Sequence, residues 1–412
     1  MKLQGDWLPG AMVRFRKIEE IFRTICIRHG YGEVRTPVVE KLHWFTGAGI
    51  LSPDLMHKIY TFIDWDGWSG ERVVLRPDNT VPVCRLFSQK MKKQNKARLF
   101  YVSDIFRYEE EENAGGEECQ LGVELLGNFK NHCIRDVELL ILLMEFLKEL
   151  KLGKPKVVIS HAGILHSYLA ALDLPEEDEI RAFDLLMEGR FNELQRICSD
   201  LGNLEGLKNL LELRGSSASF LTNLKSLGKS SAEFARAVEE LETVCAQLES
   251  LGFAFEIFPG IHRDLSYYTG IIYDVYVDDV LVGGGGRYDN LLKKFMDKSV
   301  GGSGFSVYMD PLADLMKTTK KQPCEAPKVS LLTDFKKPEY VTQAFKAASR
   351  LRKKNIVVEV FDKKQKSGAG KIRGEVKNTK IGWALEARSG GKKEIFPLPL
   401  KATKKIQNFW EI

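Results

Sequence analysis

The sequence predicts an α+β protein, with a large domain on a mostly antiparallel sheet and a small C-terminal α/β domain. Its 412 residues exceed one ordinary hydrophobic core and suggest two or three domains. The expected elements run helix, strand, hairpin, paired strands, helical segment, further strands and a last helix, an order typical of a mostly antiparallel sheet. The glycine-rich segments "VGGGGRYD" and "SGAGKIRG" agree, because neither has the spacing and context of a nucleotide-binding loop.

The first elements are indicated by apolar periodicity and by their end signals. Apolar residues at helical spacing predict a helix over residues 12–29, which Gly30 ends. A strand and its exit are expected within 31–40, and residues 60–87 predict a hairpin, a proline-containing turn and a new helix. Two strands are expected within 97–127, joined by the loop "YEEEENAGGEE", which carries six glutamates.

The middle of the chain combines a long helix, a helical insertion and more strands. The expected elements are an apolar-striped helix at 134–150, a strand at 155–160, a helix-rich insertion at about 161–250, and a strand and a helix within 299–316. Between them, residues 262–289 alternate apolar and polar side chains on both sides of Asp278 and Asp279. This pattern predicts a hairpin with the two acids in its turn.

Composition indicates where the domains meet. The first domain is expected to cover residues 1–316, and the lysine- and proline-containing segment 317–327 is a linker by its polar content. In the last domain, residues 328–412, the strand "KVSLLTD" is followed by a helix at 338–354, the strand "NIVVEVF" and a strand near "IGWALEA". This alternation predicts a small α/β domain.

The net charge of +5 is unevenly distributed. From residue 315 onward the chain has 24 Lys+Arg and 9 Asp+Glu, a net charge of +15, and the preceding part carries −10. A basic C-terminal domain can bind nucleic acid, or it can be a lysine-rich surface that docks against acidic protein. Because aromatic residues are not interleaved with the lysines, the second interpretation is favoured.

Nothing in the sequence predicts a membrane protein, a secreted protein or a metal site. The longest apolar run, "VELLILLMEFL", contains two glutamates and is too short to span a bilayer. The N-terminal "MKLQGDWLPG" lacks the apolar core of a signal peptide. The seven cysteines form no Cys-x-x-Cys pair and no set with histidine at zinc spacing, so we expect free thiols, no metal and a cytoplasmic location.

The stretch "HRDLSYYTGIIYDVYVDDVLVGGGGRYD" is the first candidate for a binding site. Arginine, two tyrosines and bare glycine backbone would project from neighbouring strands of the predicted hairpin. That combination suits a small polar ligand with a carboxylate. An ordinary hairpin with polar surface residues is the alternative that this stretch alone leaves open.

Seven segments together resemble the catalytic domain of class II aminoacyl-tRNA synthetases, specifically the histidyl enzyme. They occur in the order "YGEVRTPVVE", "YTFIDWDG", "LRPDNT", "DIFRYE", "QLGVELLG", "RDLSYYTG" and "GGGGRYDNLL". The resemblance covers about residues 5–315, and the tail is similar to that family's anticodon-binding domain in length and alternation. It implies an antiparallel sheet with helices and a helical insertion.

The resemblance implies a pocket for free histidine. In the family, an acid, a threonine and a glutamine bind the ammonium, which here are Asp78, Thr80 and Gln120. A glutamate and a tyrosine, here Glu124 and Tyr268, contact the imidazole. An arginine, here Arg263, meets the carboxylate. The full set implied here is Asp78, Thr80, Arg107, Gln120, Glu124, Arg263, Tyr267, Tyr268 and Tyr288.

The chain departs from the synthetases where they bind ATP. The loop ahead of Gln120 reads "AGGEEC", where the family has an arginine and an adenine-stacking aromatic residue. Near the end of the domain, Asp310-Pro311 stands where the family has Glu-Arg. Arg107, which faces the α-phosphate in the family, remains, and so does Arg263, so the loss is selective. Because an acidic loop repels a triphosphate, we expect neither ATP chemistry nor a cofactor, and no catalytic residues.

A histidine pocket without an ATP site is similar to the synthetase paralogues of histidine biosynthesis, the regulatory subunits of ATP phosphoribosyltransferase. The resemblance implies a non-catalytic homodimer within a hetero-oligomer, which senses free histidine for a short-form catalytic subunit. Specific tRNA binding is then not expected. Two alternatives remain: a divergent histidyl-tRNA synthetase, favoured by the basic tail, Arg107 and Arg263, and a binding module for tRNA or protein without histidine control.

Overall fold

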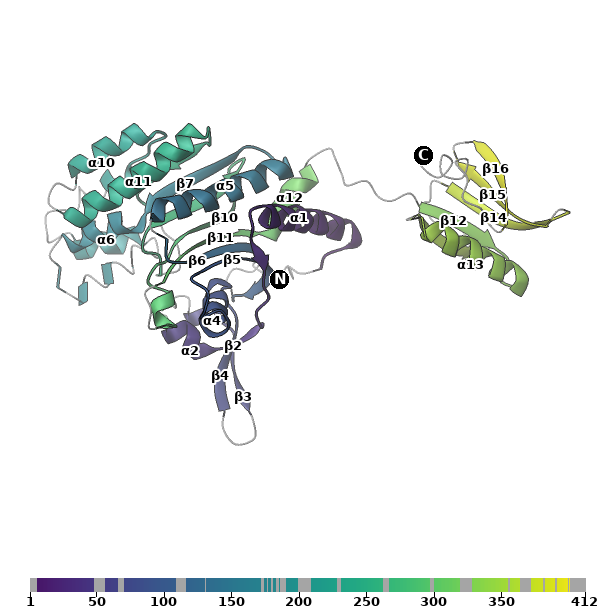
Figure 1. The fold of residues 1–412 in the computed structure, drawn as a ribbon, viewed down its shortest axis with the longest axis horizontal. Helices are drawn as coiled ribbons and strands as arrows, with labels where there is room; N and C mark the ends of the chain where they lie inside the picture. The colour runs from purple at the N-terminus through teal and green to yellow at the C-terminus, as the bar shows by residue number, and fades with distance from the viewer. Residues whose placement is uncertain are drawn as a thin grey trace. The chain divides into compact units, whose positions relative to one another are not determined.

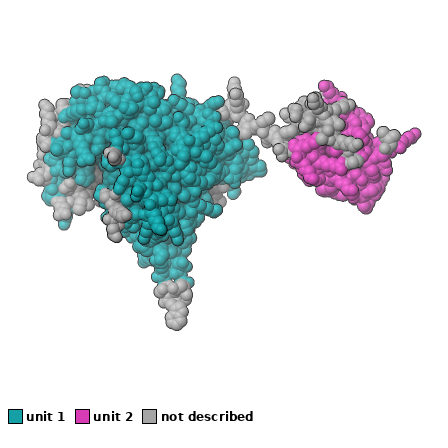
Figure 2. Space-filling view, viewed as in Figure 1, with its two compact units in different colours: residues 1–322 teal, residues 323–412 magenta. Residues whose placement is uncertain are grey.

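The structure is a computed structural model, and the chain forms two compact units, Met1–Gln322 and Pro323–Ile412 (Figure 2). It describes residues 6–47, 56–65, 70–108, 116–129, 131–171, 174–175, 177–178, 181–182, 185, 190–198, 209–227, 231–261, 267–296, 300–318, 328–354, 356–363, 372–380, 382–389, 391–398 and 400. The glutamates at 109–112, Arg263 and most of the linker lie outside these residues.

An eight-stranded sheet organises the large unit (Figure 1). Its strands, in spatial order, are β1 (Gly32–Glu33), β5 (Lys96–Phe106), β6 (Glu117–Gly127), β11 (Gly301–Tyr308), β10 (Val280–Arg287), β9 (Ile271–Val277), β7 (Pro155–His161) and β8 (Phe255–Ile257). The two outermost pairs, β1 with β5 and β7 with β8, are parallel, and the other pairs are antiparallel. The predicted α+β fold with a mostly antiparallel sheet is therefore confirmed.

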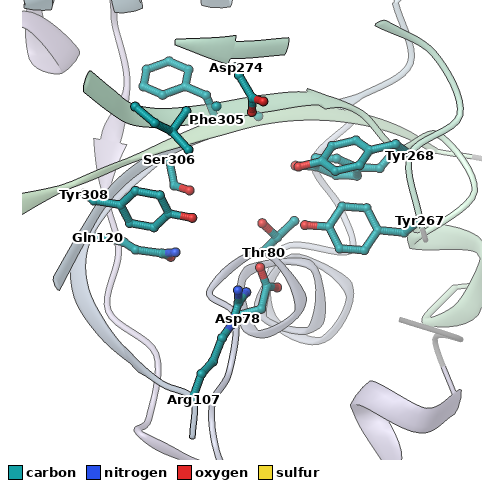
Figure 3. Close-up of a pocket in the computed structure, with 14 residues that line it drawn as sticks. Asp78, Thr80, Arg107, Gln120, Tyr267, Tyr268, Asp274, Phe305, Ser306 and Tyr308 are labelled. Atoms are coloured by element: carbon teal, nitrogen blue, oxygen red, sulfur yellow. The ribbon is translucent and has the colours of Figure 1, made fainter. Parts of the chain in front are cut away.

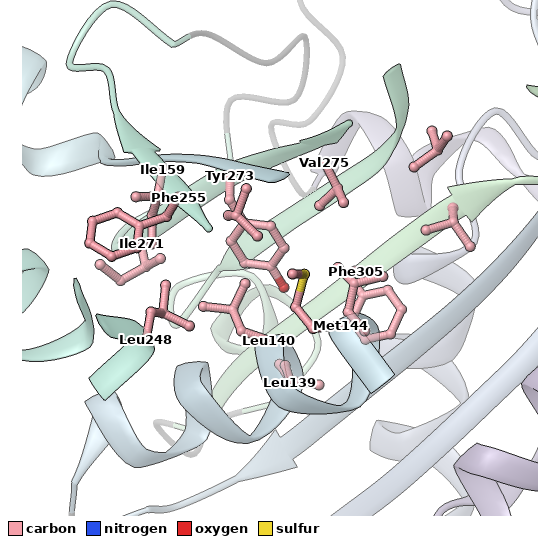
Figure 4. Close-up of a cluster of buried hydrophobic side chains, with 14 of the residues drawn as sticks. Leu139, Leu140, Met144, Ile159, Leu248, Phe255, Ile271, Tyr273, Val275 and Phe305 are labelled. Carbon is pink, nitrogen blue, oxygen red and sulfur yellow. The ribbon is translucent and has the colours of Figure 1, made fainter. Parts of the chain in front are cut away.

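One face of this sheet is covered by helices. These are α1 (Pro9–Arg28), α5 (His132–Leu150), α11 (Ala232–Ser250) and α12 (Met309–Thr318). Leu140 and Met144 of α5 belong to the same buried cluster as Tyr273, Val275 and Phe305 of the strands (Figure 4). Because successive side chains of a strand point to opposite faces, the residues between these core positions lie on the other face of the sheet.

The opposite face carries a smaller core beneath α4 (Thr80–Lys90). Val81 and Cys84 of α4 are buried in one cluster with Tyr101, Leu126 and Tyr288. A three-stranded sheet of β2 (Val39–Lys41), β4 (Gly70–Leu75) and β3 (Thr61–Trp65) and the short helix α2 (Leu42–Gly47) lie on this side of the unit (Figure 1). A 3₁₀ turn, η3 (Leu292–Lys294), follows β10.

The described part of the predicted insertion is helical. It contains α6 (Ala162–Ala170), α8 (Phe191–Cys198), η2 (Ala218–Phe220), α10 (Leu221–Leu227) and α11. Phe234, Val238 and Leu241 repeat along the buried side of α11 at helical spacing and join the main core. The insertion thereby shares a core with the sheet.

The hairpin of β9 and β10 has the expected turn. Asp278 and Asp279 both have positive φ, 46° and 66°. Two consecutive residues in this region are typical of the type I′ turn, whose twist matches that of the strands. By contrast, the single strand expected within 31–40 is wrong in detail. Those residues form β1 and β2, which belong to different sheets.

The small unit contains a five-stranded sheet. Its strands in spatial order are β13 (Val357–Asp362), β12 (Lys328–Thr333), β14 (Ile372–Thr379), β15 (Gly382–Ser389) and β16 (Lys392–Pro397). Helix α13 (Pro338–Arg352) shares its core. Strands β14 and β16 were not expected. Charged Arg373, Glu375 and Lys377 alternate with apolar positions in β14, a half-buried pattern that resembles a polar loop in sequence.

Candidate functional site

Alternation in two strands brings the predicted polar residues to one face of the sheet. Gln120, Gly122 and Glu124 follow one another at every second position of β6, on the face opposite the main core. Across the sheet, Gln120 pairs with Tyr308 and Glu124 pairs with Gly304. Helix α4 lies over the same face. The site is therefore a space between a sheet and the start of a helix.

A cavity of about 180 Å³ occupies this space (Figure 3). It is lined by Asp78, Thr80, Arg107, Gln120, Tyr267, Tyr268, Asp274, Leu281, Gly284, Tyr288, Gly304, Phe305, Ser306 and Tyr308. The volume lies below the roughly 300–1,000 Å³ typical of sites for drug-sized ligands. A single small metabolite fits this space better than a large ligand does.

Glu124 is a buried acceptor held by three hydroxyl groups. Thr80 Oγ1 donates to Glu124 Oε1 over 2.8 Å, Tyr101 donates to the same oxygen over 3.4 Å, and Tyr288 donates to Oε2. Burial raises the pKa of Glu124 to about 8, although these hydrogen bonds oppose the shift. When the group is ionised, these three donors occupy three of its about four lone-pair positions, so the carboxylate has capacity for one further donor once its proton has left.

Bare backbone makes room for this carboxyl group. A Cβ at Gly304 would stand 1.9 Å from Glu124 Oε2 and 2.6 Å from Val123 O. A Cβ at Gly122 would stand 2.1 Å from the ring of Tyr101, whose hydroxyl reaches Glu124. Each distance is impossible for a real side chain, so glycine is required at both positions.

Asp78 lies at the start of α4 and is buried. Its Oδ1 accepts a hydrogen bond from Val81 N over 2.9 Å, which caps the helix. Burial raises the pKa of Asp78, and the hydrogen bond from Val81 and the charge of Arg107 act in the opposite direction. Arg107 Nε donates to Pro77 O over 2.8 Å, which anchors the guanidinium at the cavity. An acid and a cation therefore stand together at one end of the cavity.

Three tyrosine rings form an aromatic wall. The ring centroids of Tyr267 and Tyr268 are 4.8 Å apart, and those of Tyr267 and Tyr288 are 5.5 Å apart in an edge-to-face arrangement. Figure 3 shows Tyr267 and Tyr268 on the wall opposite Gln120 and Tyr308. A flat ring between these walls would meet an aromatic surface on one side and amide and hydroxyl groups on the other.

The residue before Tyr288 anchors this wall from behind. Arg287 is 3% exposed, and its guanidinium forms ion pairs with Asp136 of α5, over 3.2 Å, and with Glu240 of α11. Burial raises the pKa of Asp136 to about 6, against the effect of Arg287. Arg287 therefore joins the end of β10, and with it Tyr288, to two helices on the other face of the sheet.

Seven of the nine predicted site residues line the cavity: Asp78, Thr80, Arg107, Gln120, Tyr267, Tyr268 and Tyr288. Glu124 is not among the lining residues, but it accepts hydrogen bonds from two of them, Thr80 and Tyr288. Arg263 lies outside the described residues. Sequence reasoning missed Tyr101, Ser306 and Tyr308. Strand pairing could have indicated Tyr101. This residue of β5 faces Gly122 of β6, which lies between Gln120 and Glu124 in the sequence.

The surroundings of the cavity are acidic. Among the described lining residues, Arg107 is the one basic residue, and Asp78 and Asp274 are acidic. At the nearby end of β6, burial and the charge of Asp104 raise the pKa of Glu117. Burial, together with the charges of Asp104 and Asp310, also raises the pKa of Cys119. Within the described part of the chain, no group of three or more His, Cys, Asp or Glu side chains could hold a metal ion. None of the described helices is long and apolar enough to cross a membrane.

Comparison with known proteins agrees with this fold. The sequence profile of the family "Histidyl-tRNA synthetase" matches residues 4–312. An ATP phosphoribosyltransferase regulatory subunit of Dehalococcoides mccartyi is 36% identical over 359 residues, covering 87% of this chain and 86% of its own. Another from that species is 32% identical over 410 residues, covering 99% and 96%. The crystal structure of an ATP phosphoribosyltransferase regulatory subunit/histidyl-tRNA synthetase from Bacillus halodurans matches with a TM-score of 0.74 and 25% identity, over 90% and 94% of the two chains.

The fold and the cavity thus define a class II synthetase-like protein with a small-ligand pocket. Within that class, the chain belongs to the histidyl-tRNA synthetase family, in the branch of the ATP phosphoribosyltransferase regulatory subunits.

Proposed function

We propose that this chain is a non-catalytic regulatory subunit, which binds free histidine and transmits its concentration to a separate short-form ATP phosphoribosyltransferase. The observation that carries the proposal is the cavity itself. It combines the donors and acceptors that histidine requires with a size below that of large-ligand sites and an acidic border. We further propose that the chain acts as a homodimer within a hetero-oligomer, as the resemblance implies.

The proposed contacts place each polar group of histidine against a side chain of opposite charge or complementary hydrogen-bonding role. Asp78 and Thr80 bind the ammonium, Glu124 accepts the imidazole N–H, and Tyr268 covers the ring. Arg263, on the segment outside the described residues, meets the carboxylate, and Arg107 and Gln120 lie at the same cavity. A buried polar group left unpaired by the wrong amino acid costs about 1–3 kcal/mol, and this penalty provides selectivity.

The acidic border argues against ATP-dependent chemistry. A triphosphate needs several cations, and Arg107 is the one cation among the described residues that line the cavity. Asp310 and Pro311, at the start of α12, stand where the synthetases have an arginine. Loss of phosphate-clamping cations removes stabilisation of the transition state and therefore slows phosphoryl chemistry.

The experiment is reconstitution with a short-form catalytic subunit. We expect a stable hetero-complex that is more active than the catalytic subunit alone and is inhibited by millimolar histidine. Gln120→Ala and Glu124→Ala should retain activation and lose inhibition, because coupling requires histidine to bind the two assembled states unequally. Glu145→Ala, at an exposed glutamate of α5, is the matched control and should be inhibited like the unmodified chain. Full inhibition of both pocket variants would show that histidine acts on the partner.

A histidyl-tRNA synthetase is the second candidate, because Arg107 lies at the cavity and the family profile is that of the synthetase. With ATP, histidine and magnesium, a synthetase would exchange pyrophosphate, whereas we expect no exchange above background. A synthetase would also form a specific complex with one tRNA. From the basic tail we expect only weak binding that falls steeply with salt.

A further inference from the structure

Asn79 lies directly behind the cavity, between two residues that line it. It is 1% exposed and precedes the first residue of α4. Its side chain does not cap the helix. Instead, Nδ2 donates to Ser103 O over 3.3 Å and to Gln120 Oε1 over 3.2 Å. The asparagine therefore connects the start of α4 to the two strands beneath the cavity, β5 and β6.

The two hydrogen bonds determine which way the Gln120 amide faces. A backbone carbonyl only accepts, so the Asn79 atom beside Ser103 O must be the NH₂ group. Its second N–H then faces Gln120, and the Gln120 atom that receives it must be the oxygen. Reversing the Asn79 amide would place an oxygen against Ser103 O. Among the described residues, Asn79 Oδ1 has no partner that would favour the reversal.

The consequence is that Gln120 presents an NH₂ group to the ligand. Gln120 is 3% exposed and extends into the cavity from the wall opposite Tyr267 and Tyr268 (Figure 3). With one of the two lone pairs of its oxygen taken by Asn79 and both N–H groups of its NH₂ free of Asn79, its remaining hydrogen-bonding capacity is mainly that of a donor. A donor suits a carboxylate and opposes an ammonium group.

We propose that Asn79 is a positioning residue that fixes Gln120 as a donor, and that Gln120 binds the ligand's carboxylate rather than its ammonium. The inference rests on the proposed function, and it changes the role that the family resemblance implies for Gln120. The pocket then selects an amino acid over the corresponding amine. Arg107 and Gln120 supply donors to the carboxylate, and Asp78 and Thr80 are left to the ammonium.

Three ligands separate the two roles. Histidine has both charged groups, histamine lacks the carboxylate, and imidazolepropionate lacks the ammonium. Binding of each is measured by calorimetry to the full chain and to Gln120→Glu. This variant keeps an oxygen for the Asn79 N–H but replaces the cavity-facing NH₂ by a second oxygen. We expect histidine and imidazolepropionate to bind about tenfold or more weakly, because a charge-assisted bond becomes a repulsion. Histamine should bind equally or more tightly.

Asn79→Ala tests the positioning role. Its release of the Gln120 amide should lower the ratio of histidine to histamine affinity by about threefold or more, since the amide can then turn either way. Asn131→Ala is the control, because Asn131 caps α5 through Cys133 N and Ile134 N, away from the cavity. That variant should lose stability and keep the affinity ratio.

The outcomes are distinguishable. If histidine binds the unmodified chain, and Gln120→Glu weakens histidine and histamine equally or strengthens histidine, Gln120 meets the ammonium and this inference is wrong while the proposed function stands. An unchanged ratio in Asn79→Ala would contradict the positioning role alone. If none of the three ligands binds the unmodified chain, both the proposed function and the inference are overturned.

Discussion

Replacing Glu124 by glutamine should stabilise the protein in alkaline solution while weakening histidine binding. Glu124 is 1% exposed, and burial raises its pKa from 4.5 to about 8. In the unfolded chain the same carboxyl group ionises near its ordinary pKa. Between these two values the folded state holds a proton that the unfolded state releases. Stability is therefore fully present below the unfolded pKa and is lost as the pH rises through the folded pKa.

The size of this change in the free energy of unfolding follows from the size of the pKa shift of Glu124. A shift from 4.5 to about 8 corresponds to at most about 5 kcal/mol, since each pKa unit is worth about 1.4 kcal/mol. Between about pH 5 and pH 9, roughly 4 kcal/mol of this loss should occur. Glutamine has the same shape and no charge, so the variant should lack this part of the pH dependence. Other raised acids, such as Asp136, are present in both proteins and largely cancel in the comparison.

The assay is urea unfolding of both proteins across that pH range, with histidine affinity measured in parallel. The free energy of unfolding of Glu124→Gln should exceed that of the unmodified chain increasingly as the pH rises. Histidine affinity should fall, because an amide replaces the acceptor of the imidazole N–H. Identical pH dependence in the two proteins would refute the description of Glu124 as a buried acid that holds its proton.

Three further variants test a buried ion pair, a glycine at the cavity and the turn of the β9–β10 hairpin. Arg287→Met removes the cation shared by the buried Asp136 and the partly buried Glu240, and should destabilise the large unit by about 3–5 kcal/mol in urea. Arg388→Ala, at a residue with a 65% exposed side chain, should cost less than about 1 kcal/mol. Gly304→Ala should abolish histidine binding in calorimetry by displacing the carboxyl group behind the cavity, whereas Gly10→Ala, with nothing within 4 Å, should leave it unchanged. Asp279→Gly should raise the melting temperature slightly, by relieving a positive φ worth up to about 1 kcal/mol. A lower melting temperature would contradict the assigned turn.

The large unit was predictable because its motifs coincide with strong local patterns. The helix expected over 12–29 is α1, and the strands expected within 97–127 are β5 and β6. The predictions that failed, for residues 31–40 and for β14, have physical causes. The segment 31–40 contributes to two sheets because the chain leaves β1 after two residues, and no periodicity indicates so short a strand. In β14, charged side chains on the outer face concealed the alternation.

The candidate site was predictable in its residues but not in its hydrogen bonds. Sequence resemblance indicated Glu124, Thr80 and Tyr288, and the structure joins these three by hydrogen bonds. It did not indicate that Tyr101 also reaches Glu124, or that Asn79 holds the oxygen of Gln120. Those contacts depend on strand register and on the position of α4 over the sheet, which distant parts of the chain determine together.

Calorimetric titration of the purified chain with histidine, and separately with ATP and magnesium, tests the central claim most directly. The account predicts saturable binding of histidine, its loss in Glu124→Ala, and no binding of ATP. Saturable binding of ATP without binding of histidine would contradict it.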